Sequence, residues 1–190
     1  MKDLFGCLLP ALCVLSLSAG TVSWKTGDYG PASWQPADGN LLAGATCVAN
    51  QISYYYEIGR ETTNDPSTLT DGVVPGDDCE YSKICGVKGG SVEWKFAMRT
   101  RLSSVRIFSR WGDNGRDGIA IEGIFVSSDG VSWTSVSGSF AYDGGTSHCR
   151  AELSADDGGF IAEDIRYLMV KFSNSQENDG GGYAEIEAVG

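Results

Sequence analysis

The chain consists of short runs of β-branched and aromatic residues that alternate with clusters of glycine. Large apolar residues recur at every second position in several runs, as at Val105 and Ile107 and at Leu168, Val170 and Phe172. This alternation is typical of strands that bury one face and expose the other. We expect strands at residues 91–98, 102–109, 119–127, 132–137, 166–173 and 183–190. Many short strands separated by turn signals predict an all-β fold, an antiparallel β-sandwich.

A hairpin is predicted within residues 123–138, whose sequence is GIFVSSDGVSWTSVSG. Asp129 and Gly130 stand at its turn, where glycine adopts a positive φ without steric cost. Trp133 follows the turn directly. An aromatic side chain at that place either packs into the core or stands at the rim of a binding site.

The first twenty residues have the pattern of a secretory signal peptide. Lys2 is followed by an apolar segment over residues 4–17, and the small residues Ser18 and Gly20 suit a cleavage site. The segment is too short for a membrane-spanning helix with stop-transfer flanks. We therefore expect a secreted protein, extracellular or periplasmic, with no membrane insertion.

After the signal peptide, the chain is long enough for one domain. Residues 21–40 carry Trp24 and Trp34 among glycine and proline, and we expect them to form an irregular N-terminal leader. Residues 41–190 then form the β-sandwich domain. No internal repeat or low-complexity linker divides them.

The net charge is −11, which argues against two classes of partner. An acidic protein gains no counterion-release energy on nucleic acid and is repelled by anionic lipid surfaces. The acidity instead favours cation binding. No Gly-x-Ser-x-Gly, His-Glu-x-x-His or phosphate-binding loop motif occurs, and His148 is the single histidine. We therefore expect a protein that is not an enzyme.

Four cysteines follow the signal peptide, namely Cys47, Cys79, Cys85 and Cys149. An even number in an exported chain favours two disulfides. Cys79 and Cys85 enclose a feasible small loop, which would leave Cys47 with Cys149, although the sequence permits three pairings. A zinc site is disfavoured, because there is no Cys-x-x-Cys pair.

Four motifs in order resemble the discoidin, or coagulation factor 5/8 type C, family. They are STLTDGVVPGD at 67–77, SSDGVSWTSV at 127–136, IRYLMVKFSN at 165–174 and YAEIEAVG at 183–190. The loop RWGDNGRDGIAIEG at 110–123 is similar to one in discoidin-like domains of secreted bacterial proteins. The tryptophan that usually follows the Asp-Gly element in this family is missing here, as is the terminal cysteine pair of its animal members.

The resemblance implies an eight-stranded jelly roll of the galactose-binding-like superfamily. Members of that superfamily are mostly non-catalytic and bind glycans, lipid headgroups or proteins through loops at one end. The resemblance further implies that Trp133 packs inward and covers one end of the sandwich.

A structural calcium ion is also implied by the resemblance. The carboxylates of Asp71 and Glu185 match the positions that converge on such an ion, with backbone help expected from Ala184. Asp77 could add a ligand, since calcium takes six to eight oxygens. On the residues alone, Asp71 could equally cap a turn and Glu185 could be a solvated strand residue.

The loop at 109–118 is the best candidate for a ligand site. Sugar sites combine an aromatic face with planar donors and acceptors, and this loop and its neighbour supply both. The expected ligand-binding residues are Arg110, Trp111, Asn114 and Arg116, joined by Tyr142 and His148 from the neighbouring loop. The arginines could instead pair with loop aspartates and only hold a turn.

The expected function is binding of a glycan or surface polysaccharide. The alternative is a cell-surface adhesion domain that binds protein and no sugar. An exposed apolar patch around Tyr54, Tyr55 and Tyr56 would favour that alternative.

Overall fold

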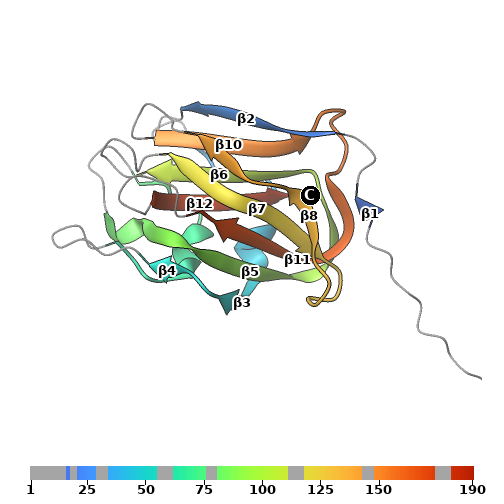
Figure 1. Ribbon diagram of the computed structural model, residues 1–190, viewed down its shortest axis with the longest axis horizontal. Helices are drawn as coiled ribbons and strands as arrows, with labels where there is room; N and C mark the ends of the chain where they lie inside the picture. The colour runs from blue at the N-terminus through green and yellow to red at the C-terminus, as the bar shows by residue number, and fades with distance from the viewer. Residues whose placement is uncertain are drawn as a thin grey trace, which may run out of the picture.

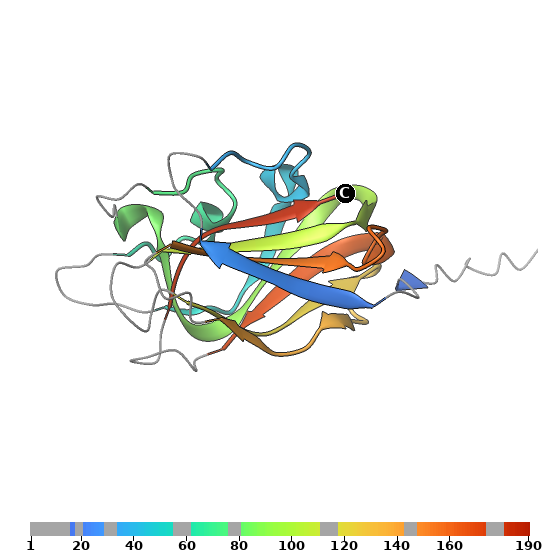
Figure 2. The ribbon, with the colours of Figure 1, turned by 90° about the horizontal axis from the view of Figure 1, so that it is seen from above.

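The computed structural model describes residues 16–17, 21–28, 34–54, 62–75, 81–110, 118–142, 148–173 and 181–190. Over these residues the chain is an antiparallel β protein with two facing layers of strands (Figures 1 and 2). The strands are β1 (Ser16–Leu17), β2 (Val22–Asp28), β3 (Thr46–Asn50), β4 (Ser53–Tyr54), β5 (Cys85–Leu102), β6 (Ser104–Arg110), β7 (Ile119–Ser127), β8 (Thr134–Ser137), β9 (Phe140–Tyr142), β10 (His148–Ala155), β11 (Ala162–Phe172) and β12 (Gly181–Val189). Short 3-10 helices lie at η2 (Leu41–Gly44), η3 (Pro66–Leu69) and η4 (Tyr81–Lys83). None of the helices in the described segments is long and apolar enough to cross a membrane.

The strand order is β2-β10-β6-β12-β5-β11-β7-β8, and the long strand β5 belongs to both layers. Its first residues pair with β12 in one sheet, and its later residues pair with β11 in the other. The change of sheet occurs at Gly89 and Gly90, whose φ angles are +132° and +93°. A Cβ atom on Gly90 would lie 2.1 Å from the carbonyl oxygen of Gln51, so only glycine fits there.

The core lies between the two layers, as the alternating pattern predicts. Val105 and Ile107 of β6 and Leu168, Val170 and Phe172 of β11 are all buried in it. Burial of such apolar surface contributes about 25 cal/mol per Å² and is the main stabilising term of the fold. The predicted fold class, an antiparallel β-sandwich, is confirmed.

The predicted strand at 119–127 matches β7 residue for residue, and those at 91–98 and 166–173 lie mostly within β5 and β11. The expectation of an irregular leader over residues 21–40 is wrong for its first part. Val22–Asp28 form β2, which pairs with seven consecutive residues of β10 at the edge of one sheet. Trp24 of this strand packs against the core and stacks on Phe140 at a ring distance of 4.2 Å. The signal peptide stays a prediction, because most of residues 1–20 lie outside the described residues.

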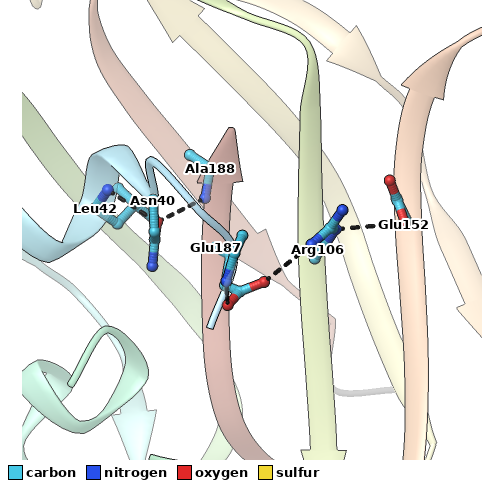
Figure 3. Close-up of polar contacts among 7 residues, drawn as sticks. Asn40, Leu42, Arg106, Glu152, Glu187 and Ala188 are labelled. Atoms are coloured by element: carbon cyan, nitrogen blue, oxygen red, sulfur yellow. Dashed lines mark hydrogen bonds and ion pairs between the residues drawn. The ribbon is translucent and has the colours of Figure 1, made fainter. Parts of the chain in front are cut away.

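The last part of the expected leader, residues 34–40, is also attached to the sandwich. The side chain of Asn40 accepts hydrogen bonds from the backbone N–H groups of Leu42 and Ala188, each at 3.1 Å (Figure 3). Leu42 is buried, and the ring of Trp34 meets Phe108 edge-on. Trp34 therefore lies against Phe108 of β6, and the segment around Asn40 and Leu42 lies against β12.

Trp133 does not pack inward as expected. Its ring lies edge-on to Tyr167 with centroids 6.4 Å apart, and Tyr167 faces outward because its neighbour Leu168 faces the core. Gly130 has a φ of +79°, and a Cβ atom there would lie 3.0 Å from the Tyr167 ring. The missing side chain lets Tyr167 lie over the turn, and Trp133 follows it to the outer surface.

Candidate functional site

Two of the expected ligand-binding residues face each other at one end of the sandwich. Arg110 ends β6 and His148 begins β10, and the antiparallel register pairs them directly. The end of β6 and the start of β10 lie at the left in Figure 1. Arg110 is only 3% exposed, which is unusual for a side chain that always carries charge. This end of the sheet thus places a guanidinium with several N–H donors beside a half-buried imidazole.

Tyr142 lies at the same end but in the other layer. It ends β9 and pairs with Ile119, the first residue of β7, and its ring packs against the core. Trp111, Asn114 and Arg116 lie outside the described residues, so their place in a site stays a prediction.

The core behind this end is closed by a residue that the sequence did not single out. The Tyr183 hydroxyl on β12 donates to the carbonyl of Ala120 on β7 at 2.8 Å and accepts from its N–H at 3.0 Å. Complete burial raises the pKa of this phenol well above its usual range. The two bonds connect the two sheets and give the strand ends a rigid base.

A β-bulge in β12 separates Tyr183 from the acidic residues that follow it. The register shifts between Tyr183 and Glu185, so Tyr183 faces the core while Glu185 and Glu187 face the opposite side. Strict alternation would have placed Tyr183 and Glu185 on the same face. The irregularity is therefore what turns the Glu185 carboxylate toward the turn that carries Asp71.

Glu185 is fully buried and lies beside the turn at Asp71. One carboxylate oxygen accepts a hydrogen bond from the N–H of Gly72 at 3.1 Å, and the other has no hydrogen-bond partner among the described residues. Burial, together with the negative charges of Asp71 and Glu187, raises the pKa of Glu185 to about 9. Burial also raises the pKa of Asp71, whose carboxylate accepts from the N–H of Val73 at 2.8 Å.

This arrangement suits a hard cation. Two carboxylates from distant parts of the sequence share one neighbourhood, and one buried carboxylate oxygen lacks a donor. Calcium binds such oxygens together with backbone carbonyls. The described residues contain no group of three or more His, Cys, Asp or Glu side chains that could hold a metal, so carbonyls such as that of Ala184 would be needed. Asp77 lies outside the described residues.

Of the two expected disulfides, only the Cys47–Cys149 pair lies wholly within the described residues, and it does not form. Cys47 is an exposed thiol on β3, opposite Trp94 in one sheet, whereas Cys149 is buried in β10 of the other sheet, opposite Ser109. The prediction of a Cys47–Cys149 bridge is therefore wrong, because the Cys47 thiol is exposed on one sheet whereas the Cys149 thiol is buried in the core beside the other. Cys85 is a thiol in the core, where burial raises its pKa to about 12, and its expected partner Cys79 lies outside the described residues.

The tyrosine run expected to favour a protein partner is described only at its start. Tyr54 is half-buried against the core, and its hydroxyl accepts from the Asn50 amide at 2.6 Å. Tyr55 and Tyr56 lie outside the described residues. Tyr54 thus supplies no exposed apolar patch.

No protein-family model matches the chain, and no curated protein matches it in sequence. Solved structures do match its fold. The Clostridium perfringens module CpGH89CBM32-5, in complex with GalNAc-β-1,3-galactose, superposes with a TM-score of 0.53 at 17% identity, covering 80% of this chain and 100% of the module.

Two further structures show the same similarity. The family 32 carbohydrate-binding module of C. perfringens NanJ, in complex with galactose, has a TM-score of 0.52 at 16% identity and covers 78% of this chain and 95% of its own. Chitosan-binding module 1 of a Paenibacillus sp. IK-5 chitosanase/glucanase has a TM-score of 0.50 at 19% identity, covering 80% and 100%. The chain therefore has the discoidin-like, galactose-binding-like fold of these modules.

Proposed function

We propose that this protein is an exported carbohydrate-binding module that acts by binding alone. Its ligand is a glycan or a surface polysaccharide, held at the end of the sandwich where β6 ends and β10 begins. The observation that carries the proposal is the pairing of Arg110 with His148 at that end, within a fold shared with sugar-binding modules.

The chemistry of this end suits sugar hydroxyls. A guanidinium offers a rigid fork of N–H donors, and a neutral imidazole both donates and accepts. The expected contributions of Trp111, Asn114 and Arg116 add an aromatic face for the sugar ring and further polar contacts. The proposed role requires no acid–base pair, in keeping with a single histidine in the chain.

Calcium would act as a structural ion beside this site. Asp71 and Glu185 would hold it through their carboxylates, and Ala184 through its carbonyl. The ion would neutralise two carboxylates that otherwise lie together without a metal, and it would join the Asp71 turn to β12.

The test is a binding screen on the folded, mature protein. A glycan array and polysaccharide pull-downs should show saturable binding, with GalNAc-β-1,3-galactose, galactose and chitosan as the first probes. Trp111→Ala should lower affinity by about 2 kcal/mol, roughly thirtyfold, if its ring stacks on the sugar.

The matched control is Trp133→Ala, which removes an indole from the outer face of the other sheet and should leave affinity unchanged. A blank screen with a protein shown to be folded by circular dichroism would overturn the proposal. The search would then turn to protein partners.

A further inference from the structure

A row of alternating charges crosses the outer face of the sheet formed by β2, β10, β6 and β12. Lys25 lies opposite Glu152, Glu152 opposite Arg106, and Arg106 opposite Glu187. The four side chains come from four different strands, so only the strand register brings them into one row.

Arg106 is held in place from both sides. Its guanidinium lies 3.4 Å from the Glu152 carboxylate and 3.6 Å from that of Glu187 (Figure 3). Glu187 is fully buried, and its other oxygen accepts from the N–H of Ala37 at 2.8 Å. The orientation of Arg106 therefore needs no ligand, which lowers the entropy cost of binding one.

The next row toward the end of β10 consists of small side chains. Ser154 lies opposite Ser23 on one side and opposite Ser104 on the other. Ser104 and Ser154 line an open hollow of about 310 Å³, bordered by Gly158 and Gly159 in the turn after β10. That volume is at the lower end of the range for small-molecule sites.

The turn after β10, which borders the hollow, is hydrogen-bonded to the start of β2. The Asp156 carboxylate accepts hydrogen bonds from the hydroxyls of Thr21 and Ser23, which joins the turn to the start of β2. These bonds hold the pKa of Asp156 below its usual range, so the turn stays fastened at neutral pH.

The lining has the chemistry of a site for a polyhydroxylated ligand. It offers an ammonium, a guanidinium, a carboxylate and several serine hydroxyls, and the aliphatic side chains that line it among the described residues are those of Ala155 and Val189. Such a mixture supplies donors and acceptors for sugar hydroxyls.

We propose that this groove, lined by Lys25, Arg106, Glu152 and Ser154, is a second sugar-binding site. It is separate from the site at Arg110 and His148, because Ser104 and Arg110 are the two ends of β6, about 20 Å apart at roughly 3.3 Å per residue. Two sites on one chain let a polysaccharide bind bivalently, with higher avidity than either site gives alone.

The experiment is an amide NMR titration of the ¹⁵N-labelled mature protein with galactose and, separately, with galacturonate. We expect saturable shifts at the amides of Ser104, Ser154, Gly158 and Gly159 with at least one of the two sugars. Ser154→Tyr, which fills the hollow from the outer face of β10, should abolish these shifts. Lys25→Ala should weaken them about tenfold, the loss of one charged hydrogen bond.

Lys95→Ala is the control, since it removes the same charge from the outer face of the other sheet. Shifts confined to the surroundings of Arg110 and His148 would overturn the second site and leave the proposed function standing. Shifts confined to the groove would overturn the proposed site at Arg110 and His148 and leave the second site standing. The second site would also be overturned if the groove shifts persisted in Ser154→Tyr, or if neither sugar produced shifts in the groove.

Discussion

The hydroxyl of Tyr183 and the backbone of Ala120 exchange two hydrogen bonds across the core, at 2.8 and 3.0 Å. Tyr183 lies on β12 and Ala120 on β7, so the pair joins the two sheets behind the strand ends that carry Arg110 and His148. The base of the proposed sugar site is therefore fixed by a polar contact within an apolar core.

Tyr183→Phe should destabilise the protein by about 1–3 kcal/mol, because it leaves the buried N–H of Ala120 without its side-chain acceptor, whereas the carbonyl of Ala120 keeps the N–H of Ser173. Chemical denaturation followed by circular dichroism measures this loss. Tyr54→Phe is the matched control, since it removes a hydroxyl bonded to an exposed asparagine and should cost less than about 1 kcal/mol. Equal effects of the two changes would contradict the structural role of Tyr183.

Chelation should lower the melting temperature of the mature protein, and added calcium should restore it. The reason is that an ion bound only by the folded state stabilises that state by mass action. Glu185→Gln should remove the response, whereas Glu122→Gln, on the exposed face of β7, should keep it. A melting temperature that ignores both chelator and calcium would refute the calcium proposal.

The carboxylate of Asp129 should make the stability of the fold depend on pH in acid. Hydrogen bonds from the backbone N–H groups of Ser132 and Val131 and from the Ser127 hydroxyl lower its pKa to about 2. A carboxylate with a lowered folded-state pKa stabilises the fold above its ordinary pKa near 4, and this contribution disappears as the pH falls through about 2. Asp129→Asn should therefore be less stable than the natural protein at pH 7, with the gap narrowing toward pH 2. A stability difference between the two proteins that does not depend on pH would mean that the charge of Asp129 does not contribute to stability.

Gly90→Ala should destabilise the protein strongly. The change combines a positive φ with a Cβ atom 2.1 Å from the Gln51 carbonyl, and backbone strain alone costs about 1–3 kcal/mol. Gly138→Ala is the control, because nothing lies within 4 Å of the position that its Cβ would take. If thermal unfolding gave the same result for both variants, the bend of β5 would not depend on glycine.

Thiol labelling should show that Cys47 and Cys85 differ in reactivity. Cys47 is exposed and should react with a maleimide in the native protein, whereas Cys85 is buried with a raised pKa and should react only after unfolding. Peptide mapping by mass spectrometry identifies the labelled residue. Failure of Cys47 to label unless a reductant is present would reveal a disulfide at that position.

The sequence by itself determined the class of fold and much of its strand layout. Period-two alternation and glycine turns placed the strand at 119–127 at its observed bounds, because these signals are local. The sequence pattern did not predict β2 and β10. In β10, Cys149, Ala151, Leu153 and Ala155 alternate with polar residues, but small apolar side chains give only a weak signal of a strand.

Only the tertiary structure decided which residues meet. The bulge in β12 turns Glu185 away from the core, the absence of a side chain at Gly130 takes Trp133 to the outer face, and the order of strands separates Cys47 from Cys149. The charged row from Lys25 to Glu187 has the same origin. Alternation determines the face on which a side chain lies, but its neighbours on that face depend on strand order and register, which are set by long-range pairing and packing.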